Sequence, residues 1–331
     1  MAKRPLVEQY EALMRGDQAK TTNGESLDAS TPLLEALQRD GFVKVPSLVA
    51  PHMLLALRGA SAYVTQRARD GKWSHIRTVP KQFPPWPSTP PPDTEGGIWG
   101  VQHLLHPDMP VRDLFAEIYF GDAVLGVVKQ LLGGVSDDGL VMELFNLLVS
   151  PSGEKDFELC WHRDDVKPDL EPEEEARQLE EKSPAGRQSH AQYNIALTED
   201  ASLVVVPGSH RRPRTKTERD ADPYEARLPG QVLVELQAGD AVFYDSNILH
   251  RGIYKGIHPN SALGRFTLHG SVGLAGHSQE RSRQVLQHGV GEWIGRAQFG
   301  PEGSNLERAE AMRKRLVAMG GGNDLGYSLD G

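Results

Sequence analysis

Short β-type segments separated by turns dominate the chain between residues 140 and 273. Seven such segments are LVMELFNLLV, DFELCWHRD, AQYNIALTE, SLVVVPGS, QVLVELQ, AVFYDSNILH and RFTLHGSVG. Many short strands with turns between them are typical of a β-sandwich or jelly roll. We therefore predict a mainly β core over residues 140–275, in which GQVLVELQAGDAVFYD forms two strands joined at Ala238–Asp240.

Helical patterns flank this core on both sides. Before it, capping signals, glycines and apolar periodicity predict helices over residues 32–40, 51–69 and 122–132, and a short strand over residues 42–45. After it, Ser304 and Glu307 form a capping box for a helix that ends at Gly320. The predicted fold class is therefore mainly β with flanking helices.

The predicted organisation is a single domain. It comprises a flexible arm over residues 1–30, an N-terminal helical flank with a proline-rich loop over 31–139, the core over 140–275, and a C-terminal helical flank over 276–331. Within the core, nine of the eighteen residues from 164 to 181 are acidic. Such a run is usually a solvated surface helix or a mobile excursion, and its position beside a histidine motif leaves a lid as the alternative.

The composition excludes several classes of protein. With 36 Lys and Arg against 45 Asp and Glu among 331 residues, the net charge is -9, which argues against a protein that neutralises nucleic-acid phosphates. Cys160 is the single cysteine, which excludes an internal disulfide and favours a reducing compartment. No apolar run approaches the ~20 residues that span a bilayer. We expect a cytoplasmic protein with a small-molecule substrate, without nucleic acid or membrane as partner, and of open oligomeric state.

Two His-x-Asp motifs differ in their surroundings. His106-Pro-Asp108 contains a proline and lies outside the β-rich region, so we assign it to a loop. His162-Arg-Asp164 follows the strand-like segment FELCW, where alternate side chains share a face. The second motif is therefore the candidate for chemistry.

A pair of metal ligands on one face follows from this alternation. His162 and Asp164 point to one side, while Arg163 and Asp165 point to the other. A non-haem Fe(II) centre needs two His and one carboxylate on one face and leaves three coordination positions open. His250 is the third ligand that we predict, because it ends the strand-like segment AVFYDSNILH after a Gly-Asp turn.

A guanidinium for an anionic cosubstrate lies fifteen residues after His250. Arg265 opens the segment RFTLHGSVG and could hold a dicarboxylate tail through two parallel hydrogen bonds, which a lysine would do less selectively. This is the anchor expected for 2-oxoglutarate. Arg251 and Lys255 are the alternatives for this role.

Taken together, these segments resemble the phytanoyl-CoA dioxygenase family of Fe(II)/2-oxoglutarate-dependent oxygenases. The resemblance rests on WHRD, NIALTEDASLVVVPGSHR, AGDAVFYDSNILHRG and the arginine-bearing terminal strand, and LQRDGFVKVP adds a weaker match. It implies a double-stranded β-helix, which is a cupin-like jelly roll. It also implies Fe(II) held by His162, Asp164 and His250, with 2-oxoglutarate held by Arg265.

Four further polar side chains are interpreted beside this resemblance. The resemblance implies that Asn194 lies near the cosubstrate. Asn146 lies on an apolar segment, and either a cosubstrate contact or a structural hydrogen bond would satisfy it. His210 and His269 are interpreted as satisfied core or rim residues.

The activity that the resemblance implies is oxidation of a small organic metabolite by O₂, most simply hydroxylation, with succinate and CO₂ as coproducts. Desaturation and other oxidative outcomes use the same iron, so the motif leaves them open. Asp164 argues against a halogenase, in which a small residue stands at this position. The alternative class is a jelly-roll metalloprotein that uses a divalent metal for non-oxidative chemistry or for ligand binding.

Overall fold

The computed structural model describes residues 33–79, 86–87, 89–152, 155–184, 188–256, 264–276, 279–299 and 306–320. The helices are α2 (Leu33–Asp40), α3 (Pro51–Arg69), α4 (Arg112–Phe120), α5 (Asp122–Leu131), α6 (Pro172–Lys182), α7 (Lys216–Asp220), α8 (Gln279–Gln287) and α9 (Leu306–Gly320). The strands are β1 (Phe42–Val45), β2 (Ile76–Thr78), β3 (Ile98–Val101), β4 (Leu140–Val149), β5 (Phe157–Glu158), β6 (His190–Ala196), β7 (Asp200–Val205), β8 (Val232–Leu236), β9 (Ala241–Tyr244), β10 (His250–Tyr254) and β11 (Phe266–Leu274). The predicted arm over residues 1–30 and the capping residue Ser304 lie outside the described residues.

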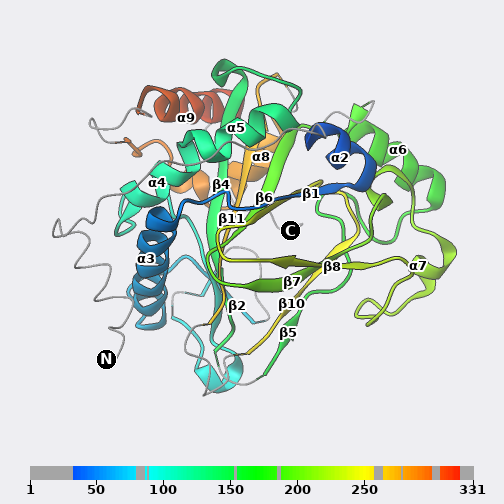
Figure 1. Ribbon diagram of the computed structural model, residues 1–331, viewed down its shortest axis with the longest axis horizontal. Helices are drawn as coiled ribbons and strands as arrows, with labels where there is room; N and C mark the ends of the chain where they lie inside the picture. The colour runs from blue at the N-terminus through cyan, green and yellow to red at the C-terminus, as the bar shows by residue number, and fades with distance from the viewer. Residues whose placement is uncertain are drawn as a thin grey trace.

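Two antiparallel sheets form the centre of the described structure. The larger sheet has seven strands in the order β1-β9-β6-β11-β4-β3-β2, and the smaller sheet has four in the order β5-β10-β7-β8. Figure 1 shows α4, α5 and α9 along the outside of the larger sheet, and α6 and α7 at the opposite end of the molecule. The predicted jelly roll with flanking helices is confirmed.

Strand β6 shows why both faces of the larger sheet are buried. Ala191, Tyr193 and Ile195 point into the main hydrophobic core, which the sheet shares with the surrounding helices. The polar residues that alternate with them are His190, Gln192 and Asn194. Because alternate residues of a strand face opposite sides, these three face the interior between the two sheets. The strand thus separates an apolar core from a polar interior.

The chain changes sheets at the turn predicted at Ala238–Asp240. β8 belongs to the smaller sheet and β9 to the larger one, so the two strands that this turn joins are not neighbours in a sheet. Gly239 has a φ of +100°, a conformation that favours glycine. The Asp240 carboxylate accepts hydrogen bonds from the backbone N–H groups of Ser47 and Gln237, and this fixes the turn against the chain that follows β1.

The N-terminal flank contains the predicted elements and also some that the sequence did not reveal. α2, β1, α3 and α5 lie where they are predicted, and α5 is followed by Gly133 and Gly134 with φ values of +86° and +80°. Helix α4 and strands β2 and β3 were missed. The two strands have only three and four residues, too few for a periodic signal. They extend the larger sheet, so residues 31–139 supply strands as well as helices.

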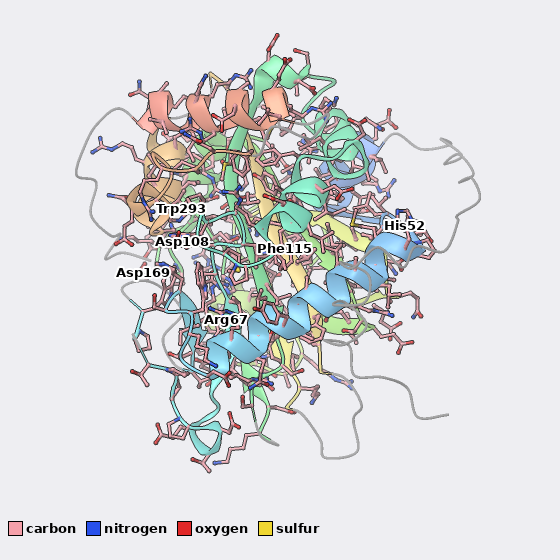
Figure 2. All side chains as sticks on the ribbon, turned by 90° about the vertical axis from the view of Figure 1, so that its left-hand side faces the viewer. His52, Arg67, Asp108, Phe115, Asp169 and Trp293 are labelled. Atoms are coloured by element: carbon pink, nitrogen blue, oxygen red, sulfur yellow. The ribbon has the colours of Figure 1, made fainter. Side chains whose placement is uncertain are left out.

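Helix α3 packs against β3 and α4. Figure 2 shows it crossing the molecule between the labelled His52 and Arg67, with Phe115 of α4 beside it. Its buried apolar residues are Leu57, Ala60, Val64 and Ala68. They recur every three or four positions, as on the apolar face of an amphipathic helix. In the described parts of the chain, none of the helices is both long and apolar enough to cross a membrane.

Three histidines pack together next to β2 and β3. The ring of His75 lies 4.8 Å from that of His103 and 5.5 Å from that of His106, measured between centroids. Burial lowers the pKa of all three, and it lowers the pKa of His106 to about 4. His106 lies in a loop, as predicted, and its Nδ1 accepts a hydrogen bond of 3.0 Å from the N–H of Asp108. The folded protein therefore keeps these rings neutral at neutral pH.

Acid should destabilise the fold through this cluster. Unfolding returns each ring to an ordinary histidine pKa of ~6.5, so the unfolded chain binds more protons between that value and the lowered pKa of the folded protein. This stabilisation is complete above about pH 6.5 and is lost as the pH falls towards 4. We predict a lower melting temperature at about pH 5 than at about pH 7.5. His106→Asn, which keeps an acceptor in place of Nδ1 but does not titrate, should reduce that difference; an unchanged difference would contradict the explanation.

Candidate functional site

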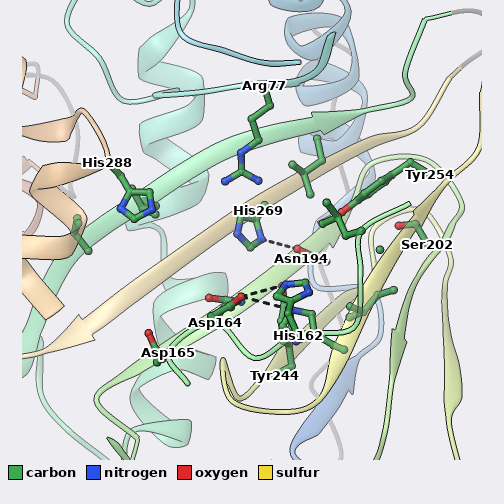
Figure 3. A pocket seen from close by; sticks show the side chains of 18 of the residues that line it. Arg77, His162, Asp164, Asp165, Asn194, Ser202, Tyr244, Tyr254, His269 and His288 are labelled. Carbon is green, nitrogen blue, oxygen red and sulfur yellow. Dashed lines mark hydrogen bonds and ion pairs between the residues drawn. The ribbon is translucent and has the colours of Figure 1, made fainter. Parts of the chain in front are cut away.

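A cavity of about 190 Å³ lies between the two sheets and reaches α8. Figure 3 shows polar side chains around it from β2, β6, β7, β9, β10 and β11. The charged residues among those that line it are Arg77, Asp164, Asp165, Arg265 and Arg281. The cavity therefore offers three guanidinium groups and two carboxylates to a ligand.

The three predicted metal ligands meet at this cavity. The Oδ1 atom of Asp164 lies 3.5 Å from the Nε2 atom of His162 and 3.7 Å from the Nε2 atom of His250. One potential ligand atom from each residue lies within 4.8 Å of the others. Among the described residues, this is the only such group of three His, Cys, Asp or Glu side chains.

Backbone hydrogen bonds orient both imidazoles for metal binding. The Nδ1 atom of His162 lies 2.7 Å from the carbonyl oxygen of Cys160, and that of His250 lies 2.8 Å from the carbonyl oxygen of Ile248. A carbonyl oxygen can only accept, so each Nδ1 carries the proton and each Nε2 keeps its lone pair. Gln192 donates to Oδ2 of Asp164 over 2.8 Å. Two imidazole nitrogens and one carboxylate in this orientation fit a divalent iron ion.

The protonation states of Asp164 and His250 also suit a cation. Burial raises the pKa of the Asp164 carboxyl, but the two imidazoles and the Gln192 amide outweigh it, so the net pKa lies well below its usual range. Burial, followed by the proximity of His162, lowers the pKa of His250 to about 4. Burial also lowers the pKa of His162, but the Asp164 carboxylate outweighs this and raises it overall. At neutral pH, Asp164 is ionised and His250 is neutral, the states in which they bind metals.

Two details of the predicted arrangement were wrong. His250 does not end a strand over residues 241–250: β9 ends at Tyr244 and β10 begins at His250, because a turn interrupts the segment. Asp165 was assigned to the face away from the ligands, yet it lines the cavity. The strict alternation of a strand does not apply there, since β5 ends at Glu158 and His162 forms only an isolated β-bridge.

Arg265 lies on the wall of the same cavity, just before β11. Its Nε donates to Oδ2 of Asp200 over 2.9 Å, and the hydroxyl of Thr267 donates to the same oxygen over 2.6 Å. The guanidinium carbon lies 4.8 Å from the ring centroid of Tyr254. The Nη1 atom of Arg265 is buried and has no hydrogen-bond partner in the described structure. This buried donor fits an anionic group of a ligand.

The two alternatives to Arg265 have other contacts and do not line the cavity. Arg251 lies 3.4 Å from the Glu158 carboxylate and stacks over the ring of Trp161. Lys255 forms an ion pair with Asp156 at the surface. The geometry therefore favours Arg265 as the anchor.

The predicted asparagines differ in their surroundings. Asn194 lines the cavity, and its Oδ1 lies 2.8 Å from the Nδ1 of His269. Asn146 does not line it; its Oδ1 accepts a hydrogen bond from the backbone N–H of His103. The structural hydrogen bond, one of the two interpretations of Asn146, is therefore the one that the structure provides, and the cosubstrate contact is not supported.

The two remaining histidines differ in whether they line the cavity. His210 lies outside the cavity, and its Nε2 contacts the carbonyl oxygen of Gln38. His269 was interpreted as a core or rim residue, but it is part of the cavity wall. Burial, followed by the charge of Arg77, lowers the pKa of His269 to about 3, so the ring is neutral. Its position follows from the alternation of β11, which also turns Thr267 towards Asp200.

Sequence reasoning missed several residues of the cavity wall. Gln192 was detectable in principle, because it alternates with apolar residues in β6 and lies two positions before Asn194. Arg77 gave no signal, since β2 is short and far from the core segments in sequence. Figure 3 shows its guanidinium above His269. The Nε atom of Arg77 is buried without a partner among the described residues, and burial lowers the pKa of the group.

Arg163 lies between the predicted ligands His162 and Asp164 in the sequence and does not line the cavity. It donates to the carbonyl oxygens of Ser209, Asn247 and Arg212. Its Nε also donates to Oε1 of Glu175 over 3.1 Å. Both side chains are buried, with exposed fractions of 2% for Arg163 and 0% for Glu175. The residue between the two ligands is therefore fixed by at least four hydrogen bonds.

Glu175 belongs to α6, so the acidic insertion contains the predicted surface helix. Most of its acidic residues are exposed, whereas Glu175 accepts ion pairs from Arg163, Arg214 and Arg219. Three guanidinium groups around one buried carboxylate connect this helix to the ligand segment.

Comparison with known proteins supports the same architecture. The sequence profile of the family described as phytanoyl-CoA dioxygenase (PhyH) matches residues 37–253. No curated protein matches the sequence at a significant level.

Several solved structures are similar to this chain to different degrees. EctD from S. alaskensis, solved with 2-oxoglutarate and 5-hydroxyectoine, is 18% identical, with a TM-score of 0.51 over 78% of this chain and 79% of that chain. AviO1 from Streptomyces viridochromogenes Tue57 is 21% identical, with a TM-score of 0.49 over 76% of this chain and 96% of that chain. The epimerase SnoN from nogalamycin biosynthesis is 18% identical, with a TM-score of 0.44 over 73% and 82%. At this level of identity, the first of these likenesses shows a shared fold.

The role of Glu175 can be tested by neutralising it. We predict that Glu175→Gln lowers the free energy of unfolding by on the order of 3 kcal/mol, because it leaves buried guanidinium charge uncompensated. Glu174→Gln, one residue away on the same helix, neutralises a carboxylate whose ion pair with Arg177 lies at the surface, and it should change stability much less. Urea unfolding of both variants measures the difference. Equal losses would show that the buried cluster is not important for stability.

Proposed function

The chain belongs to the phytanoyl-CoA dioxygenase family, and from this premise we propose that it is an Fe(II)- and 2-oxoglutarate-dependent oxygenase. One observation carries the proposal: a His-Asp-His ligand set and an arginine with an unpartnered buried N–H line one cavity in the described structure. The ligand set suits iron, and the arginine suits the carboxylate of a keto diacid.

In this proposal, His162, Asp164 and His250 hold the iron. Bound there, iron would couple the oxidative decarboxylation of 2-oxoglutarate by O₂ to removal of hydrogen from a substrate C–H bond. The contribution of the chain is to fix the three ligands before the metal arrives. The Cys160 and Ile248 carbonyls hold the two Nε2 lone pairs towards the metal position. Ligands that are already ordered lose little conformational entropy on binding.

Arg265 is the proposed partner of the distal carboxylate of 2-oxoglutarate. Asp200 accepts from Nε of Arg265 and thereby leaves Nη1 for a ligand. The lining residues Arg77 and Asn194 could contribute a second positive charge and an amide contact on the same wall. Burial strengthens each of these interactions, because water does not compete for the donors.

The proposed reaction is hydroxylation of a small organic metabolite, with succinate and CO₂ as coproducts. The part of the cavity nearest α8, lined by Gln284, Val285 and His288, is the place we propose for the substrate. We also propose a cytoplasmic location, since the single Cys160 gives no disulfide to protect. The alternative, non-oxidative chemistry with another divalent metal, would give Arg265 no ligand to hold.

Metal and cosubstrate binding can be tested without a known substrate. Added to metal-free protein under anaerobic conditions, Fe(II) and 2-oxoglutarate should produce a visible metal-to-ligand charge-transfer absorption. Admission of O₂ should then give slow formation of succinate. His162→Ala should show neither signal, because it removes a ligand. If the wild-type protein behaved like His162→Ala, the proposed function would be wrong.

The role of Arg265 can be tested separately. We predict that Arg265→Lys weakens 2-oxoglutarate binding by about 10- to 100-fold, the effect of losing a charge-assisted hydrogen bond of fixed geometry. The matched control, Lys255→Met, removes a cation that does not line the cavity and should leave binding unchanged. Titration of the charge-transfer absorption gives both dissociation constants. Equal constants for the Arg265 variant and wild type would exclude Arg265 as the anchor.

A further inference from the structure

A second cavity, of about 330 Å³, adjoins the first one. Asp165, Arg281 and Gln284 line both cavities. A molecule bound beside His162, Asp164 and His250 could therefore extend into the second cavity. The other walls of the second cavity come from the end of α6, the start of β6, the turn between β9 and β10, and α8. It therefore lies directly beside the proposed metal centre.

Three residues that line this second cavity each carry a buried polar atom with no hydrogen-bond partner within the described residues. These atoms are Oε1 of Gln188, Nε2 of His190 and Oδ1 of Asn247. The exposed fractions of His190 and Asn247 are 5% and 3%. Buried polar groups in proteins are nearly always hydrogen-bonded, so these atoms are available to a ligand or to an ordered water.

The hydrogen bonds that these three side chains already make define which groups a ligand would have to supply. The Nε2 atom of Gln188 donates to Oδ2 of Asp245 over 2.9 Å, which orients the amide and leaves its oxygen as an acceptor. Oδ1 of Asn247 is also an acceptor. The Nδ1 atom of His190 lies 3.0 Å from the Ser189 hydroxyl, and the Nε2 atom of His190 is the third atom without a partner among the described residues. Two of the three atoms can only accept, so the ligand must carry O–H or N–H donors.

The charges around the cavity argue against an anionic ligand. Its two cations already have carboxylate partners: Arg281 lies 2.7 Å from Glu143, and Lys182 lies 3.6 Å from Glu280. A carboxylate or phosphate would meet the oxygens of Gln188 and Asn247 and would be repelled by them.

The carboxylates that line this cavity also have hydrogen-bond or ion-pair partners, which argues against an ammonium ligand. Both oxygens of Asp245 accept hydrogen bonds, from Gln188 and from the backbone N–H of Asn247. Asp165 accepts from the Ser246 hydroxyl and faces Arg281 at 3.8 Å. Glu181 pairs with Arg177, and Glu280 pairs with Lys182. The buried oxygens of the lining that have no partner among the described residues are neutral amide oxygens, which match hydroxyl or amide groups.

We propose that the second cavity is a substrate subsite for a neutral portion bearing hydroxyl or amide groups, whose reacting carbon lies in the first cavity. This proposal rests on the proposed function for the identity of the reacting end. The inner face of β6 supports continuity between the two parts, because His190 lines the second cavity and Gln192 and Asn194 line the first. A polar substrate could thus run along one strand from the subsite to the metal ligands.

Three soluble probes with one carbon skeleton test the charge preference: neutral 1,5-anhydroglucitol, anionic gluconate and cationic glucosamine. Saturation-transfer NMR with the full chain reports binding and needs no turnover. We expect the neutral probe to give the strongest signal. The strongest signal from gluconate or glucosamine, or no signal from any probe, would overturn the proposal.

Variants locate the binding. Asn247→Leu and Gln188→Met each remove an unpartnered acceptor and should reduce the neutral probe's signal at least fivefold. Gln178→Met, on α6 but outside both cavities, is the matched control and should keep the signal. Melting temperatures check the fold; for Asn247→Leu we expect no decrease, because the lost atom had no partner. Signals that are equal in all variants would overturn the proposal.

Probe binding and the oxygenase signals are separate measurements, so failure of the subsite can be distinguished from failure of the proposed function. Probe binding with no charge-transfer absorption and no succinate would retain the subsite and reject the oxygenase. Succinate formation without probe binding would retain the oxygenase and reject the subsite.

Discussion

The site depends on an antiparallel backbone bridge between His162 and His250. The N–H of each residue donates to the carbonyl oxygen of the other, over 3.0 and 3.1 Å. Residues paired in this way lie directly opposite each other, and the two rings lie 4.3 Å apart between centroids. A further bond, from the N–H of Asp164 to the Ser246 carbonyl, holds the third proposed ligand beside this bridge. The peptide backbone thus sets the ligand geometry, and the side chains need only their preferred hydrogen bonds to complete it.

The interior between the sheets is polar, and the polarity differs between its two ends. In the first cavity the unpartnered buried atoms are donors, Nε of Arg77 and Nη1 of Arg265; in the second they include the acceptor oxygens of Gln188 and Asn247. An unsatisfied buried group costs ~1–3 kcal/mol. The apolar face of the larger sheet, buried under the helices, supplies the stability that offsets this cost.

The sequence predicted the ligand triad because a motif and a strand pattern coincided there, and it predicted Arg265 because an arginine opens the last core strand. It could not place His250 at the start of β10, since a turn inside an apolar segment has no strong signal. Arg77 could not be predicted for a different reason: only the pairing of β2 with β3, and of β3 with β4, brings it to the cavity. For Asn146, local sequence left two roles open, and the distant N–H of His103 decides between them.

The acidic insertion shows how composition and position can lead to opposite interpretations. Nine acidic residues beside a site left a lid as the alternative to a solvated helix or a mobile excursion, yet one of them, Glu175, is fully buried against three arginines. Movement of α6 away from the core would separate that carboxylate from Arg163. It would expose buried charge or leave it without a partner, at a cost of several kcal/mol. Because Arg163 lies between two of the proposed metal ligands, the same movement would disturb the proposed metal centre. Helix α6 is therefore better understood as a fixed support of the ligand segment, and substrate access must use a part of the cavity that opens without moving Glu175.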